Sequence, residues 1–213
     1  MRYGIDDILR DVRVALDLNI TSEALENDVD TLSVDDIIRS NIERSAYIIE
    51  RDAPLHLLDE GKDFGDCSIS WRSNVGYGMG SILLPDDFLR LVSFQMSDWS
   101  MPVSTFIDES DPLYLLQQSR YEGIRGNPQH PVVAIVHKPI GKVLEFYSCK
   151  CGNSAYVKQA MYISCPKADM GYIDICERLK DAIVYHIAYM TCCSMGNSQL
   201  GEIMLNTSKG FLE

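Results

Sequence analysis

The 213-residue sequence lacks long apolar runs, and positive charge is scarce in it. No stretch approaches the roughly 18 consecutive apolar residues that a membrane-spanning helix needs. The 19 lysines and arginines face 31 aspartates and glutamates, which gives a formal net charge of -12. Nucleic acids and anionic lipid surfaces are bound through many basic side chains acting together. The composition therefore predicts neither DNA binding nor membrane binding.

Targeting signals and a disulfide framework are also missing. Residues 1–7, MRYGIDD, hold two aspartates where a secretory signal would have a basic and then an apolar segment. We therefore expect a protein that is neither secreted nor inserted into a membrane. The cysteines are odd in number, and in a reducing compartment they serve as small apolar side chains. They are Cys67, Cys149, Cys151, Cys165, Cys176, Cys192 and Cys193.

The sequence offers no convincing metal or nucleotide motif. Structural zinc sites usually separate paired cysteines by at least two residues, whereas Cys149 and Cys151 are separated by one. The glycines of residues 76–80 could suggest a phosphate loop, but that loop must open a helix. Here an extended run follows and ends at Pro85. We therefore expect no bound metal and no cofactor.

Catalytic motifs are equally sparse. No G-x-S-x-G nucleophile turn is present. One alternative remains open, a small cytosolic thiol hydrolase in which Cys149 or Cys151 is the nucleophile and His137 is the base, because such chemistry needs this pair of groups. A second alternative is an intracellular binding module with an exposed β edge. The inventory as a whole favours a protein that is not an enzyme.

The periodicity of apolar residues predicts helices near both ends of the chain. Residues 5–18 and 34–53 have helical spacing, with Ser33 as the N-cap of the second helix and Pro54 beyond its end. Residues 174–195 form a third apolar stripe, which Gly196 should terminate. We expect these three helices to form a bundle.

The middle of the chain, about 63–165, has the pattern of antiparallel strands. Short runs rich in β-branched and aromatic residues alternate there with glycine, proline, serine and asparagine. A short helix is expected at 111–121. The strands are expected at 66–72, 80–84, 89–97, 102–107, 131–137, 142–149 and 156–164. The order of helices, strands and helix predicts an α+β fold, with one domain over 1–196 and a mobile C-terminal arm over 197–213.

The most distinctive stretch lies within residues 80–107. Leu84 is followed there by Pro85, Asp86, Asp87, Phe88, Leu89 and Arg90, with Trp99 and Pro102 downstream. Together with the runs at 131–136 and 144–147 and the helix at 173–188, this stretch resembles the head–tail connector (adaptor, or ring) proteins of tailed double-stranded-DNA phages. The resemblance is closest to the connectors of crAss-like Bacteroides phages.

The resemblance implies a virion protein at the head–tail junction, assembled in the host cytoplasm. Such connectors form a homo-oligomeric ring, commonly of twelve copies, beneath the portal protein, extend the DNA channel and dock tail or further ring proteins. DNA would pass through without specific binding, and an acidic wall suits that role. The helices would form most contacts between copies, the strand loops would face the tail, and the arm would reach the portal. The portal-binding residues would be Leu200, Ile203, Met204, Leu205, Phe211 and Leu212.

Overall fold

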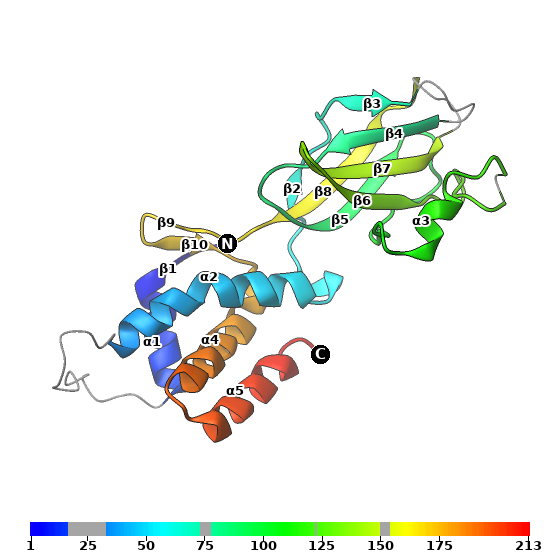
Figure 1. Ribbon diagram of the computed structural model, residues 1–213. Coiled ribbons are helices and arrows are strands. Elements are labelled where there is room, and N and C mark those ends of the chain that lie inside the picture. The colour runs from blue at the N-terminus through cyan, green and yellow to red at the C-terminus, as the bar shows by residue number, and fades with distance from the viewer. Residues whose placement is uncertain (17–32, 73–77, 122, 150–153) are drawn as a thin grey trace. The chain divides into compact units, whose positions relative to one another are not determined.

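The computed structural model describes residues 1–16, 33–72, 78–121, 123–149 and 154–213 (Figure 1). Its contacts divide the chain into two compact units. The helical unit comprises Met1–Asp59 and Cys165–Glu213, and the β unit comprises Glu60–Ser164. The mixed composition of helices and antiparallel sheets confirms the coarse fold prediction. The single domain expected over 1–196 thus spans both units, and residues 197–213 belong to the helical unit.

The described residues of the helical unit form four α-helices and a small sheet. The helices are α1 (Ile5–Ala15), α2 (Val34–Asp52), α4 (Lys180–Ser194) and α5 (Ser198–Gly210). The sheet has the order β1 (Arg2–Gly4), β10 (Tyr172–Asp174), β9 (Ala168–Asp169), and its strands are antiparallel. Helix α4 packs against α1, α2 and α5, and most of its residues are buried. Burial on several sides explains why α4 is apolar over most of its circumference.

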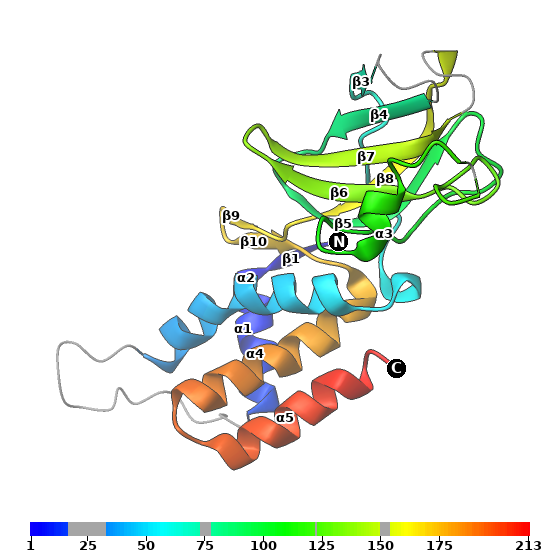
Figure 2. The same cartoon turned by 45° about the vertical axis from the view of Figure 1, so that its right-hand side comes forward.

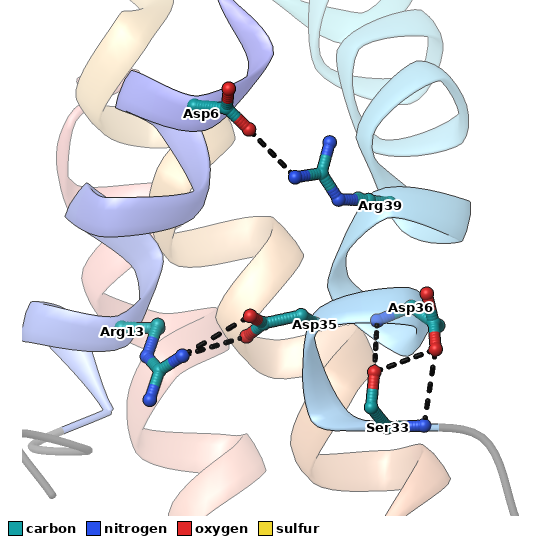
Figure 3. A network of polar contacts seen from close by, with 6 residues as sticks. All are labelled: Asp6, Arg13, Ser33, Asp35, Asp36 and Arg39. Carbon is teal, nitrogen blue, oxygen red and sulfur yellow. Dashed lines mark hydrogen bonds and ion pairs between the residues drawn. The ribbon is translucent and has the colours of Figure 1, made fainter. Parts of the chain in front are cut away.

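Two ion pairs connect α1 with α2, and a capping box begins α2 (Figure 3). The Ser33 hydroxyl accepts a hydrogen bond from the Asp36 backbone N–H at 3.2 Å, and the Asp36 carboxylate accepts one from the Ser33 N–H at 3.2 Å. This capping box confirms the predicted N-cap. Arg13 pairs with Asp35 at 3.0 Å, and Arg39 pairs with Asp6 at 2.6 Å. The Arg13–Asp35 pair is partly buried and the Arg39–Asp6 pair is exposed. An exposed pair contributes less than about 1 kcal/mol, so the second pair orients the helices more than it stabilises them.

The helix expected over 174–195 is shorter in the structure, where α4 covers only Lys180–Ser194 and α5 follows as a separate helix. Residues Tyr172–Asp174 instead form β10, and a 3-10 turn, Glu177–Leu179, precedes α4. The register Arg2↔Asp174 explains the difference, because β1 lies about 170 residues away in sequence and supplies partners that local periodicity cannot reveal. Gly196 ends α4 with a φ of 77°, as predicted.

Two antiparallel sheets share one core in the β unit (Figure 2). One sheet has the order β2 (Lys62–Asp63), β8 (Val157–Ser164), β5 (Phe88–Met96). The other has the order β3 (Ile69–Trp71), β4 (Gly78–Leu83), β7 (Gly141–Cys149), β6 (Val133–Lys138). Aromatic residues dominate the core. They are Phe64, Phe88, Phe94, Trp99, Phe146 and Tyr162.

The connection from β5 to β6 departs from the sequence prediction. The strand expected at 102–107 is reduced to two isolated bridges, Phe94↔Val103 and Ile107↔Ala134. These bridges attach its two ends to different sheets, so it cannot continue as one strand. The helix expected at 111–121 is limited to α3 (Pro112–Leu116), whose cap Asp111 accepts from the Leu113 N–H at 2.8 Å. Within the described ranges, no helix has both the length and the hydrophobicity needed to span a bilayer.

Candidate functional site

The six residues expected to contact the portal lie on α5 or just beyond it. Helix α5 lies along α4 in both views (Figures 1 and 2), and the Ser208 hydroxyl donates to the Ala182 carbonyl at 2.7 Å. Gly201 lies opposite Cys192, where an added Cβ would be 3.5 Å from the Cys192 Cβ. The structure thus places residues 198–210 as a helix against α4, and the mobility expected of the arm stays a prediction. Local sequence missed this packing because the contact faces of α5 are built from small residues and a single buried methionine, Met204.

Only part of the predicted portal-binding set is available to a partner. Met204 is 8% exposed and serves internal packing, whereas Ile203 is 60% exposed. Phe211 stacks on Tyr185 of α4 with ring centroids 5.6 Å apart. The remaining three are half-buried: Leu200, Leu205 and Leu212. A partner of this segment would therefore contact the outer surface of a folded helix, centred on Ile203.

A hollow of about 470 Å³ lies on the helical unit between α1 and α4. Its apolar lining includes Val14, Val184 and Tyr185, and Asp11 and Asp181 supply its charge. Lys180 pairs with Asp11 at 2.8 Å and so neutralises one of the two carboxylates. The described lining of the hollow therefore combines apolar and acidic side chains.

In the motif at 85–90, residues 85–87 form the turn between β4 and β5, and residues 88–90 begin β5. The Phe88 N–H donates to the Pro85 carbonyl at 3.0 Å, and the buried Phe88 ring stacks on Tyr162 at 5.8 Å. Asp87 accepts from the Tyr162 hydroxyl at 2.8 Å and pairs with Lys62 at 3.0 Å. Partial burial alone would raise the pKa of Asp87, but the hydrogen bonds from Tyr162 and Lys62 outweigh it and lower that pKa. This half of the motif therefore fixes β5 against β8 and β2.

The remaining motif residues divide between core and surface. Trp99 is buried and meets Phe94 edge-on at a centroid distance of 5.5 Å. Leu89 and Arg90 are half-buried, and Asp86 is exposed. The most distinctive sequence in the chain thus mainly stabilises the β unit, and only Asp86 is fully presented to solvent.

The structure separates the groups of the alternative thiol site. His137 is opposite Lys142 in the β6–β7 register, and Cys149 is opposite Gly78 at the other end of β7. Seven strand residues span about 23 Å, so the imidazole cannot reach the Cys149 thiol. Cys149 is buried in the core of the β unit, and His137 is exposed. Cys151 lies outside the described residues. Over the parts of the chain that are described, no three histidine, cysteine or acidic side chains cluster closely enough to hold a metal ion.

A buried polar cluster around Glu145 was not predicted. The Glu145 carboxylate, 2% exposed, accepts from the Arg72 guanidinium at 2.9 Å and from Lys138 Nζ at 2.7 Å through Oε1. Its Oε2 accepts from the Tyr147 hydroxyl at 2.7 Å and from the Tyr114 hydroxyl at 3.2 Å. One sequence signal could have revealed it, a lone acid within the apolar run 143–147.

Two cations in this cluster stabilise the charged form of the Glu145 carboxylate. Burial would raise the pKa of Glu145, but the hydrogen bonds from Lys138 and Tyr147 and the charge of Arg72 lower it overall. Burial, followed by the hydrogen bond to the Glu145 carboxylate, raises the pKa of Tyr147 well above its usual value. Both carboxylate oxygens already accept two donors, so Glu145 has no lone pair left with which to act as a general base. The cluster connects α3 to β7 through the hydrogen bond from Tyr114 to Glu145.

Comparison of the sequence with known proteins identified no relative. No family model matches the chain, and none of the curated proteins matches it.

Proposed function

We propose that this chain is a structural subunit of a phage head–tail connector, a ring beneath the portal that extends the DNA channel and docks tail proteins. The proposal assigns it no catalytic site and no cofactor. One observation carries it beyond the sequence resemblance, the uneven distribution of charge between the two units. Residues 1–59 and 165–213 hold 10 basic and 20 acidic residues, whereas residues 60–164 hold 9 and 11.

This distribution suits a channel component. An acidic wall repels phosphates, so packaged DNA slides past it without binding. The near-neutral β unit can approach other protein surfaces with little electrostatic cost. In the proposed connector, the helical unit as a whole provides the acidic body, and the outer surface of α5 meets the portal.

The partner assignment for α5 follows from its exposed residues. Ile203 presents the largest apolar area among the six residues proposed to contact the portal. Because α5 is already folded against α4, docking would not carry the entropy cost of ordering a free peptide.

Joining of tails to portal-bearing heads tests the function. We expect the purified chain to bind tail-less heads that carry the portal, and electron microscopy to place it at the portal vertex. Ile203→Asp should abolish the binding. Met170→Asp adds the same charge at an exposed residue of the helical unit outside α5 and should retain it. A wild-type chain that binds no heads, or one that binds them equally well without the portal, would overturn the proposal.

A further inference from the structure

The connection between β5 and β6 has an inverted distribution of polarity. We call residues 106–126, apart from residue 122, the strap. Gln117 is 3% exposed and Arg125 is buried, whereas Leu115 is 72% exposed and Tyr121 is 73% exposed. In a soluble loop the polar side chains would normally face water and the large apolar ones the core. The strap therefore presents apolar side chains outward while polar side chains anchor it.

Those anchors hold the strap on the four-stranded sheet. Tyr114 donates to Glu145 at 3.2 Å, and Arg125 Nη1 donates to the Tyr147 carbonyl at 2.9 Å. Glu109 accepts from the backbone N–H of His137 at 2.9 Å, which attaches the strap to the edge strand β6. Figures 1 and 2 both show α3 beside β6. These contacts hold the strap on the sheet before any partner arrives.

Hydrogen bonds also connect residues within the strap. Gln117 Oε1 accepts from the Gly126 N–H at 2.8 Å, and the Tyr121 carbonyl accepts from the Ile124 N–H at 3.0 Å. Its exposed apolar side chains are therefore carried on one compact loop. They are Phe106, Leu113, Leu115, Leu116, Tyr121 and Ile124. A preorganised apolar surface of this kind is typical of a protein–protein contact, because binding does not have to order it.

Charge decides which partner fits. Two copies of this chain repel each other through their helical units, which hold 10 basic and 20 acidic residues each. The β unit holds 9 and 11, so it allows two copies to approach at the lowest electrostatic cost. The strap itself carries exposed charges of both signs, Arg120, Asp108 and Glu109. Charges of both signs beside apolar side chains can pair with opposite charges on the surface of a second copy.

We propose that the exposed apolar surface of the strap is the contact between one copy of this chain and the next. The inference deepens the proposed function and rests on it only for closure of the contacts into a ring. It replaces the expectation that helices form most contacts between copies. In a ring the strap of one copy meets a different surface of its neighbour.

Sedimentation of the full chain over a range of concentrations and salt tests the contact. We expect reversible association that persists at high salt, because the contact is apolar. Leu115→Glu combined with Tyr121→Glu should weaken association at least tenfold with an unchanged melting temperature, since both side chains are largely solvent-exposed. Met170→Glu places one such charge at an exposed residue of the helical unit and should associate as the wild type does.

Three results would overturn the inference: a wild-type chain that stays monomeric at every concentration, strap variants that associate normally, or a Met170→Glu variant that is equally impaired. A monomer whose strap binds a tail protein instead would also overturn it. Failure of the proposed function looks different. Strap variants that still assemble at the head–tail junction contradict only this contact, whereas a chain that associates through the strap but never joins heads contradicts only the connector role.

Discussion

Substitution of Glu145 should lower the free energy of unfolding of the β unit strongly. Glu145→Gln leaves Arg72 and Lys138 without their shared carboxylate, and removing one partner of a buried ion pair destabilises a protein by about 3 kcal/mol. Partial exposure of both cations should keep the loss near that figure or below it. Urea unfolding measures it. Asp86→Asn removes the same charge from an exposed position and should change the unfolding free energy by less than about 0.5 kcal/mol. Equal effects of the two variants would contradict the role given to the cluster.

His186 makes the helical unit sensitive to acid. It is buried on α4, where burial and then the charge of Arg44 lower its pKa below the ordinary 6.5. The unfolded chain therefore takes up the proton more readily than the folded one, so stability is complete above about pH 6.5 and falls as the pH drops below that value. We expect the melting temperature to decline from pH 7 to pH 5.5.

A variant isolates this effect from other acid-labile groups. His186→Leu removes the titrating group and should flatten the decline of the melting temperature over that interval. His56→Leu changes an exposed histidine of the same unit and should leave the decline as it is. A steep decline that survives in His186→Leu would assign the acid sensitivity to another residue.

At the level of secondary-structure elements, α5 can be tested with two adjacent residues, one buried and one exposed. Met204→Ala should lower the free energy of unfolding by about 2–3 kcal/mol, because Met204 is buried against α4 and its loss leaves a cavity. Ile203→Ala should change it by less than about 0.5 kcal/mol, since Ile203 lies mostly in solvent. Calorimetry of the two variants compares them. If Met204→Ala were neutral, α5 would behave as the mobile arm that the sequence suggested.

The elements show which signals the sequence carries. The Ser33 cap and the helix terminated by Gly196 were predictable because their causes are local. The same is true of the strand pattern at 142–149, which becomes β7. The strand β10 was not predictable because β1 pairs with it from the other end of the chain.

The candidate sites also differ in whether local sequence or tertiary contacts determine them. The apolar residues of α5 were found by their spacing, but whether each faces α4 or solvent depends on Gly201 and Ser208, whose small size marks the contact face only once α4 is beside them. The outward apolar residues of the strap were missed for a related reason. Apolar runs predict burial, and only the inward anchoring of Gln117 and Arg125 turns them outward.

On the scale of the whole molecule, the two units differ in charge far more than in size. The helical unit carries a formal charge of -10 and the β unit -2, counted from their 10 basic against 20 acidic and 9 against 11 residues. A chain that mainly needed solubility could spread its acids evenly. Concentration of the acids in one unit is expected when one surface must avoid phosphates and another must meet protein.

This asymmetry predicts very weak binding to double-stranded DNA, even at low salt. Each Lys–phosphate contact releases counterions, and an acidic surface offers too few such contacts to offset its repulsion. In an electrophoretic mobility assay we expect no shift of a DNA fragment by the wild-type chain. Replacing the exposed Glu177, Asp181 and Glu202 with lysine raises the charge of the helical unit by six and should produce a shift that disappears as salt rises. The same replacements by asparagine and glutamine, Glu177→Gln, Asp181→Asn and Glu202→Gln, should leave binding weak. Tight, steeply salt-dependent binding by the wild-type chain would mean that a basic surface dominates despite the net charge, and the acidic unit could then not be the wall along which DNA slides.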